Sequence, residues 1–446
     1  MKPIMLIQGP VATRSGYGDH TRDITKSCLE LYSDKYDIKI MSMRWGECPM
    51  TGLDESNLEH QKIINCILKK PELPSQPHVF IQISVPNEFQ PIGKYNIGIT
   101  AGIETTHCSK EWVDGLNRMD LNIVPSEHSK RVFDSINFEK YDNETKKKIG
   151  EYKVEKPVKV LFEGLDTDIY KKTTEIVPTI DKTLNDIDEQ FVFLFVGHWL
   201  QGRPGHDRKD ISTMIDVFCQ SFKGKIKKPA LVLKTSGATF SIIDRNEITQ
   251  KINSVLEKYG ESAPSVYLLH GDLTSDEINS LYNHKKVKAH VSFTKGEGFG
   301  RPLLEASVSQ KPVIATNWSG HVDFLKHSIM LPGELKGVHK SAVWKNVIIP
   351  ESSWFYVNTN YASKIFKNVF KHYKKYLPEA RKQAKFSREN FSLDKMTAEL
   401  KQLLDEFVPQ PSEQIKLKLP KLNMKPSNSV PKQMPKVKLP KLKKVE

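Results

Sequence analysis

The chain has 446 residues, of which 38% are hydrophobic, and its formal net charge is +14 at pH 7. This length is sufficient for two or three domains with a sizeable core. No apolar run reaches the roughly 18 residues of a membrane-spanning helix, and the start MKPIMLIQGP turns polar too early for a signal peptide. The sequence therefore predicts neither kind of segment.

The cysteines of the chain are scattered and form no CxxC pair. They are Cys28, Cys48, Cys66, Cys108 and Cys219. An odd number of dispersed cysteines is typical of free thiols in a reducing compartment. We therefore expect a cytoplasmic protein without disulfides and without a metal site.

The positive charge is concentrated at the end of the chain. Residues 411–446 contain ten lysines and two glutamates, so they carry +8 and leave about +6 for residues 1–410. The same segment has six prolines and repeats Lys-Leu-Pro-Lys-Leu at 418–422 and 438–442. This composition predicts a disordered basic tail that suits a polyanion, such as nucleic acid or an acidic membrane surface. The alternative is a solubilising tail without a specific partner.

The first 165 residues show strands alternating with helical patterns. Residues 3–8 predict a buried strand, which is followed by a loop with Gly16 and Gly18 and then by a helix. Neither a GxGxxG motif nor a P-loop lysine is present, so dinucleotide and P-loop sites are not supported. Further apolar runs at 38–43, 79–85, 95–101 and 121–124 predict a parallel sheet covered on both faces. Residues 138–157, rich in Lys, Glu and Asn, predict an exposed insertion or linker.

A second series of apolar runs begins at residue 191. The loop at 197–210 is glycine-rich and basic, and it contains Arg203, Arg208 and Lys209 before the next predicted helix. A cation at a helix start is favourable if an anion binds there, because the helix dipole is positive at that end. Lys234 ends the next strand, where parallel sheets bind ligands. The alternative is that these cations are solvated surface charges.

The stretch Lys295–Ala306 (KGEGFGRPLLEA) joins a buried strand to a short helix. Its glycines predict a close approach of the backbone to a ligand at the helix start. Glu297 and Glu305 flank this turn, and carboxylates are suitable acceptors for the vicinal hydroxyls of a ribose or a hexose. The alternative is a simple tight turn with two solvated glutamates.

Several of these segments together resemble a known family. EGFGRPLLEA, followed by KPVIATNWSGHVDFL and preceded by NIGITAGIETTHCSK, resembles the donor-site signature of GT-B glycosyltransferases of the retaining type. Glycogen synthases and phosphatidylinositol mannosyltransferases are members of that group. The resemblance covers roughly residues 1–405 and implies an α/β GT-B fold, in which two Rossmann-like domains face each other across a cleft.

The resemblance also implies a division of the chain. An acceptor-side Rossmann-like domain would span 1–165 and a nucleotide-sugar domain 185–375. Helices at 376–408 would cross back to the first domain, and the tail would occupy 411–446.

The same resemblance implies roles for individual residues. Lys209 and Lys234 would neutralise the donor diphosphate, Glu297 would hold sugar hydroxyls, and Glu305 would hold the ribose diol. Further contacts to the donor are implied for Gly16, Gly18, Arg208, Gly298, Phe299 and Gly300.

Two positions depart from the family pattern. His198 stands where relatives carry an arginine, and Glu104 stands where many carry a histidine, with His107 three residues later. Either Glu104 or His107 would then lie beside the reacting carbon.

The implied activity is transfer of a hexose-like sugar from a nucleotide-sugar donor to an acceptor hydroxyl, with retention of configuration. UDP is the usual nucleotide in similar enzymes, and neither a metal nor another cofactor is expected. The acceptor stays open among glycan, lipid, protein and modified DNA. Two other hypotheses are a glycosyltransferase acting on hydroxylated DNA bases and a non-catalytic nucleotide-sugar-binding scaffold tethered to a polyanion by its tail.

Overall fold

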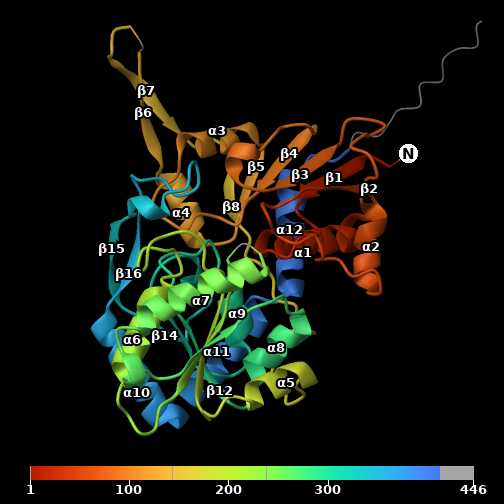
Figure 1. Cartoon of the computed structure of the whole chain (residues 1–446). Helices are drawn as coiled ribbons and strands as arrows, with labels where there is room; N and C mark the ends of the chain where they lie inside the picture. The colour runs from red at the N-terminus through yellow and green to blue at the C-terminus, as the bar shows by residue number, and fades with distance from the viewer. Residues whose placement is uncertain (1, 143, 238, 412–446) are drawn as a thin grey trace, which may run out of the picture. The chain divides into compact units, whose positions relative to one another are not determined.

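The computed structural model describes residues 2–142, 144–237 and 239–411, and it contains two six-stranded parallel sheets (Figure 1). The first sheet has the strand order β2-β1-β3-β4-β5-β8. Its strands are β1 (Ile4–Gly9), β2 (Asp37–Ser42), β3 (Val79–Ile83), β4 (Tyr95–Ile99), β5 (Leu121–Val124) and β8 (Val158–Val160). All of its neighbouring strands are parallel, as the alternating pattern predicted.

Both faces of the first sheet are buried. Ile7 and Ile81 pack with Ile24 of α1 on one face, whereas Leu6 packs on the other face in a cluster with Trp112 of α3. This follows from the period of two along a strand, which sends successive side chains to opposite faces. The helices associated with this sheet are α1 (Gly16–Tyr32), α2 (Leu58–Cys66), α3 (Lys110–Arg118) and α4 (Glu127–Ser135).

The second sheet has the order β11-β10-β9-β12-β13-β14 and is also parallel throughout. Its strands are β9 (Val192–Val196), β10 (Ala230–Lys234), β11 (Val266–Leu269), β12 (Val287–Ser292), β13 (Val313–Thr316) and β14 (Ile329–Leu331). Phe193 and Phe195 face α6, α7 and α10, and Val192 and Leu194 face the cluster that includes α8 and α9. The associated helices are α5 (Pro178–Asn185), α6 (Ile211–Phe222), α7 (Ile242–Leu256), α8 (Ser275–Asn283), α9 (Arg301–Ser307) and α10 (Thr359–His372). A capping box opens α8, in which Thr274 and Glu277 are bonded reciprocally.

One hydrophobic cluster continues from the first sheet into the second. It joins Ile97 and Ile123 to Leu165 on the connecting segment and to Leu304 on α9. Residues 1–409 accordingly form one compact unit, and residues 410–446 form a second.

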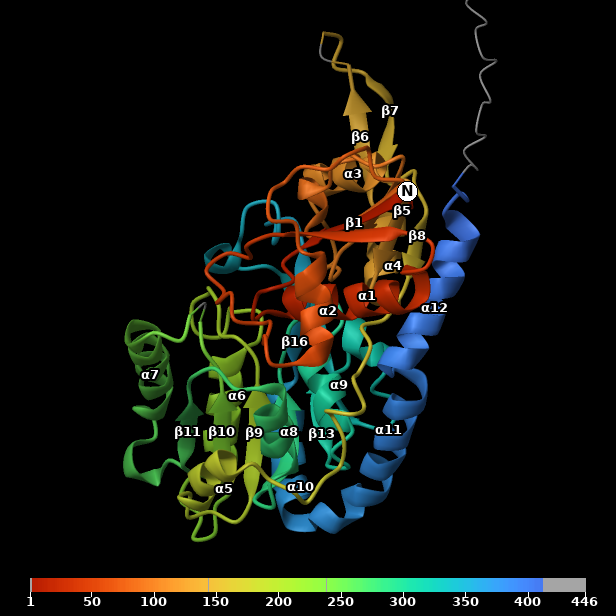
Figure 2. The ribbon, with the colours of Figure 1, turned by 90° about the vertical axis from the view of Figure 1, so that its right-hand side faces the viewer.

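Two long helices complete the larger unit, α11 (Leu377–Asn390) and α12 (Leu393–Phe407). Figure 2 shows α12 running alongside α1 of the first sheet. Ser27 on α1 and Thr397 on α12 share a hydroxyl hydrogen bond of 2.7 Å, and Leu165 N donates to Phe391 O at 2.8 Å. The last helix therefore packs on the first half of the molecule.

Residues 138–157 do not form a linker, as the sequence left open, but largely an antiparallel hairpin that projects from the first sheet (Figure 1). Its strands are β6 (Asn137–Tyr141) and β7 (Lys148–Lys153). Phe138 and Tyr152 pair across the strands and pack on the core cluster of α3, which holds the base of the hairpin. The many polar residues of the segment gave no apolar pattern from which the two strands could be predicted.

A smaller hairpin, β15 (Gly333–Gly337) and β16 (Ser353–Val357), follows β14. The short 3-10 helices are η1 (Pro86–Glu88), η2 (Gly260–Ser262), η3 (Gly320–Asp323), η4 (Lys340–Ala342) and η5 (Tyr373–Tyr376).

The predicted disorder and polyanion binding of the tail concern residues 412–446, which lie outside the described residues. Across the part of the chain that is described, every helix is too short or too polar to cross a bilayer.

Candidate active site

The loops at the carboxyl ends of the two sheets touch each other. Ser126, which caps α4 behind β5, donates its hydroxyl to Gly298 O at 2.6 Å. A Cβ added at Gly298 would overlap Ala101 O, and one added at Gly296 would overlap Glu104 O. The glycine-rich loop after β12 therefore packs directly on the loop after β4.

The sequence predicted that these glycines let the backbone approach a ligand, and the packing adds a steric role within the protein. Gly296 and Gly298 are required by the backbone of the first sheet's loops, and a Cβ at Gly320 would in turn overlap Gly298 O. Only Gly300 has left-handed backbone, with φ of 102°, which turns the chain into α9. Much of the motif's glycine content thus has a steric explanation within the protein.

Glu297 forms the centre of an ion cluster between the two sheets. Its carboxylate pairs with Lys209 Nζ and with Arg208 Nη1, the latter at 3.1 Å. Arg208 also lies 3.4 Å from Glu104 of the first sheet, measured from Nε to Oε1. Four residues predicted separately from the sequence are thereby in one chain of contacts.

The electrostatics of this cluster keep the Glu297 carboxylate ionised, whereas burial lowers the pKa of Lys209 although Glu297 opposes that shift. Burial acts to raise the pKa of Glu297, but Lys209 and Arg208 outweigh it and lower the pKa to about 2. Close by, desolvation and the neighbouring Lys234, Lys209 and Arg208 act to lower the pKa of His198, although the residue is exposed. These cations disfavour a charged imidazole at the position where the family resemblance implies an arginine.

Lys209 is positioned by a buried ion pair behind it. The next residue, Asp210, has left-handed backbone (φ 51°), precedes α6, and binds Lys295 Nζ through Oδ1 at 2.7 Å. Lys295 is completely buried and lies against the rings of Trp354 and Tyr356. A buried pair of this kind is sensitive to loss of either partner.

Lys234 lies apart from the Glu297 cluster. Its Nζ donates to Gly271 O at 2.7 Å and lies 5.4 Å from the centre of the Phe240 ring. Lys234 lies at the carboxyl end of β10, next to His198. Lys234 and Lys209 are therefore at the same end of the sheet.

Glu305 lies on α9 and is bound on both sides. Its Oε1 accepts from Arg301 Nε at 3.2 Å, and its Oε2 accepts from Tyr282 OH at 3.2 Å. Burial raises the pKa of Glu305 to about 7, although Arg301 opposes the shift. The protonation state of the Glu305 carboxyl group therefore changes near neutral pH.

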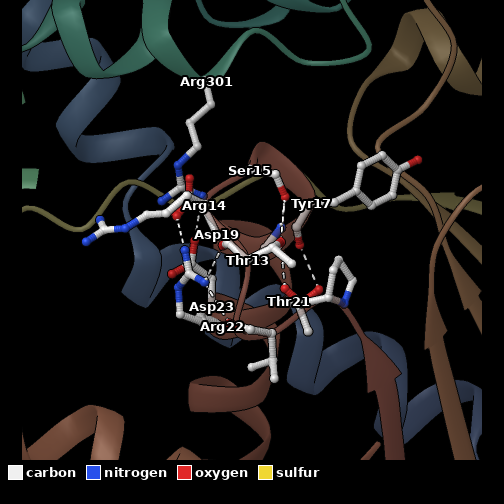
Figure 3. A network of polar contacts seen from close by, with 12 residues as sticks. Thr13, Arg14, Ser15, Tyr17, Asp19, Thr21, Arg22, Asp23 and Arg301 are labelled. Atoms are coloured by element: carbon white, nitrogen blue, oxygen red, sulfur yellow. Dashed lines mark hydrogen bonds and ion pairs between the residues drawn. The ribbon is translucent and has the colours of Figure 1, made fainter. Parts of the chain in front are cut away.

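Arg301 also reaches the first sheet. Figure 3 shows its guanidinium extending toward α1, where Nη1 binds Asp23 Oδ2 at 2.6 Å; Asp19 on the same helix pairs with Arg22. Burial raises the pKa of nearby Glu163 to about 8, against the opposing effect of Arg301. The bridge was not predicted from the sequence. The Arg301–Glu305 spacing of four residues was a usable signal, but nothing local pointed to Asp23.

Gly16 and Gly18, which the sequence placed in the first loop, lie in the first turn of α1 and have unequal roles. A Cβ at Gly18 would overlap Thr13 O, whereas one at Gly16 would meet no atom within 4 Å. Between them, Tyr17 OH contacts Thr100 Oγ1 at 3.0 Å and accepts from Ala101 N at 3.1 Å (the tyrosine is labelled in Figure 3). Gly18 is thus needed by the loop itself, and Gly16 leaves open space.

The remaining predicted residues are also located. His107 packs at 5.4 Å from the Phe138 ring of the β6–β7 hairpin, so Glu104 and not His107 contacts the ion cluster. The Phe299 side chain is 2% exposed and packs on Phe324, which leaves only its backbone for a ligand. Across residues 2–142, 144–237 and 239–411, no group of three or more His, Cys, Asp or Glu side chains is placed to hold a metal ion.

A comparison with protein families finds a match for the part of the chain that contains the second sheet. Residues 185–339, which include the whole Glu297 cluster except Glu104, match the family model described as glycosyl transferases group 1. No curated protein sequence matches the chain.

Solved structures with a similar fold extend over nearly the whole chain. HepE of Anabaena in complex with UDP and glucose is 12% identical, with a TM-score of 0.56, covering 91% of this chain and 100% of that one. Sucrose-phosphate synthase of Thermosynechococcus elongatus is 14% identical, with a TM-score of 0.57 and coverage of 91% and 99%. A glycosyltransferase of Rickettsia africae is 13% identical, with a TM-score of 0.58 and coverage of 92% and 100%. The chain thus has the GT-B fold, and its residues 185–339 match the model of the glycosyl transferases group 1 family.

Proposed function

We propose that the chain transfers a hexose-like sugar from a UDP-sugar to an acceptor hydroxyl with retention of anomeric configuration. The observation that carries this proposal is the Glu297 cluster, in which Arg208, Lys209 and Glu104 meet between the carboxyl ends of the two sheets. Such ends are where open α/β sheets bind ligands. The complexes of HepE with UDP and with UDP-glucose support UDP as the nucleotide.

In this proposal the cations serve the departing diphosphate. Arg208 and Lys209 are held by Glu297 before any ligand arrives, so little reorganisation is needed when negative charge develops on the leaving group. Lys234, at the end of the neighbouring strand, adds a third cation. Glu297 would then accept hydrogen bonds from the sugar, and Glu305 from the ribose.

The reaction breaks one bond and forms one. The bond between the anomeric carbon and the β-phosphate oxygen breaks, and UDP leaves with the electron pair. The acceptor oxygen bonds to the same carbon from the same face, and its proton passes to the departing phosphate. Retention is proposed from the resemblance to retaining enzymes.

We propose that these cations make a divalent ion unnecessary. Arg and Lys can neutralise a diphosphate directly, as a metal ion would. Transfer activity should then be unchanged by excess EDTA, whereas a loss restored by Mg²⁺ or Mn²⁺ would contradict this part of the proposal. The five unpaired cysteines support the proposed cytoplasmic compartment, because it keeps thiols reduced.

The first test is a thermal-shift panel of UDP, UDP-sugars, ADP-glucose and GDP-mannose. We expect one nucleotide sugar to raise the melting temperature, because a ligand that binds only the folded state stabilises it. Glu305→Gln, which keeps the side-chain size, should abolish the shift. Glu163→Gln is the matched control, because it changes another buried carboxylate near Arg301 and should keep the shift. If no nucleotide sugar stabilises the wild type, the proposal fails.

A second measurement separates an enzyme from a nucleotide-sugar-binding scaffold. Glycosyltransferases commonly hydrolyse their donor slowly without an acceptor, so released UDP should accumulate with the wild type. Acceptor screening should then include glycans, lipids, proteins and DNA with hydroxylated bases. Binding of the donor without hydrolysis or transfer would favour the scaffold.

A further inference from the structure

A second concave site lies at the opposite end of the second sheet. It is a cavity of about 620 Å³, lined by the segment before α5, the turn between α8 and β12, the start of β12, and the turn before β13. Both ribbon views show α5 at the end of this sheet that is remote from the first sheet (Figures 1 and 2). The six residues of β12 separate the cavity from the glycine-rich loop by roughly 15–20 Å.

The lining of this cavity is strongly basic. It contains Lys172, Lys285, Lys288 and Lys311, and within the described residues none of these is paired with a carboxylate. The only carboxylate of the lining, Asp181, lies 3.3 Å from His284 Nε2. The cavity therefore has an excess of positive charge, with four lysines against the single carboxylate of Asp181.

Lys311 distinguishes this cavity from a solvated basic surface. It is only 7% exposed, and its Nζ donates to Tyr282 O and His284 O, both at 2.7 Å. Burial lowers the pKa of Lys311, and the neighbouring Lys172 and Lys288 lower it further. An ammonium that is buried and repelled by two others is costly unless an anion offsets the repulsion.

We propose that this cavity binds a small soluble molecule that carries several phosphate groups. Lysines on three separate segments converge on one concavity, and lysine ammonium groups bind phosphate as point charges. The volume lies within the range of about 300–1,000 Å³ typical of small-molecule sites. Thr174 of the same lining offers a hydroxyl for a neutral hydrogen bond. A concave site favours a compact ligand over a flat membrane or a nucleic-acid duplex.

The test uses the full chain and inorganic tripolyphosphate, titrated by calorimetry at low salt. The wild type should bind it at a saturable site. Lys172→Ala with Lys288→Ala should weaken binding at least about tenfold, because two charge-assisted contacts are lost. Lys225→Ala with Lys227→Ala removes the same charge from an exposed turn far along the chain and should change binding less than about twofold.

A third variant separates this site from the proposed donor site. Arg208→Ala with Lys209→Ala should leave the tripolyphosphate site intact. Within the described residues Lys172 and Lys288 make no ion pair; Lys172 Nζ donates a long hydrogen bond of 3.4 Å to Asn283, and Lys288 lies 5.8 Å from the centre of the Tyr373 ring. The double variant should therefore lower the melting temperature without ligand only slightly. The Lys172→Ala/Lys288→Ala double variant should lose the stabilisation by tripolyphosphate. Lys311 is left unchanged because it supports two backbone carbonyls.

Three results would overturn the proposal. They are no binding by the wild type, equal binding by the Lys172/Lys288 variant, or loss of binding only in the Arg208/Lys209 variant. Vesicles containing a phosphoinositide form a separate arm. Binding to these vesicles without binding of tripolyphosphate would assign the basic cavity to a membrane and overturn the soluble ligand.

Discussion

The Glu297 carboxylate is shared by two cations of one loop, Arg208 at 3.1 Å and Lys209. Arg208 has a second carboxylate partner in Glu104, whereas Lys209 has none among the described residues. The two cations therefore differ in how freely they could turn toward a ligand. If Lys209 is replaced by alanine, Glu297 still has its ion pair with Arg208.

We predict that Lys209→Ala lowers kcat by about 100–1,000-fold, because one group that stabilises the leaving diphosphate is lost. Lys209→Arg should recover part of the rate, since the charge is kept. Steady-state kinetics of donor hydrolysis or transfer measure the effect, with Lys225→Ala as a surface control. An unchanged kcat in a folded Lys209→Ala variant would remove Lys209 from the chemistry.

The buried carboxylates near Arg301 predict a pH dependence of stability. Burial raises the pKa of Glu163 to about 8 from its ordinary value of 4.5. The folded state then holds a proton that the unfolded state releases, so the free energy of unfolding falls as the pH rises from about 4.5 to about 8. In Glu163→Gln this contribution is absent, and the decline across that window should be smaller.

Urea unfolding at several pH values between 5 and 8.5 measures this difference. Glu334→Gln, at an exposed position, should follow the wild type. Parallel curves for the wild type and Glu163→Gln would show that Glu163 does not titrate in this range.

At the scale of elements, the loop after β12 is shaped by its contact with the loop after β4. We predict that Gly298→Ala destabilises the protein by about 1–3 kcal/mol, because the new Cβ would overlap the Ala101 carbonyl and force two backbones apart. Gly337→Ala on β15 meets no atom within 4 Å and is the control. Urea unfolding of both variants tests the prediction, and equal stabilities would contradict it.

The elements differ in how far the sequence predicts them. The strands of both sheets stand out as apolar runs because parallel strands are buried on both faces. The β6–β7 hairpin was missed because, of its strand residues, only Phe138 and Tyr152 pack on the core. Most of the others are polar, and the hydrophobic Tyr141 and Ile149 are exposed.

The part of the site that lies at or after the carboxyl ends of buried strands could be predicted from the sequence. Lys209, Lys234 and Glu297 follow buried strands of one sheet, and the family resemblance relates them to each other. The Arg301–Asp23 bridge joins residues 278 positions apart. The periodicity of a helix or a strand relates only residues a few positions apart, so it could not predict this contact.

At the scale of the whole molecule, residues 1–409 form one compact unit that does not include residues 410–446. We predict that deleting residues 410–446 leaves the urea midpoint unchanged. If the tail contacts a polyanion, the deletion should reduce the slope of log K against log salt for heparin or DNA, because up to ten lysines are removed. Replacing those lysines by serine should have the same effect as the deletion. A midpoint shift, or an unchanged slope for a polyanion that the wild type binds, would contradict one part of this prediction.

The contacts between the two sheets limit how halves of GT-B proteins can be recombined. A half built on the second sheet, transplanted from this chain, would bring Gly298 and Arg301 with it. In a foreign first half, Gly298 would face a different loop in place of residues 101–104, and Arg301 would be buried without Asp23. Domain exchange intended to alter acceptor choice should therefore transfer α1 and the loops after β4 and β5 as a matched set with the glycine-rich loop.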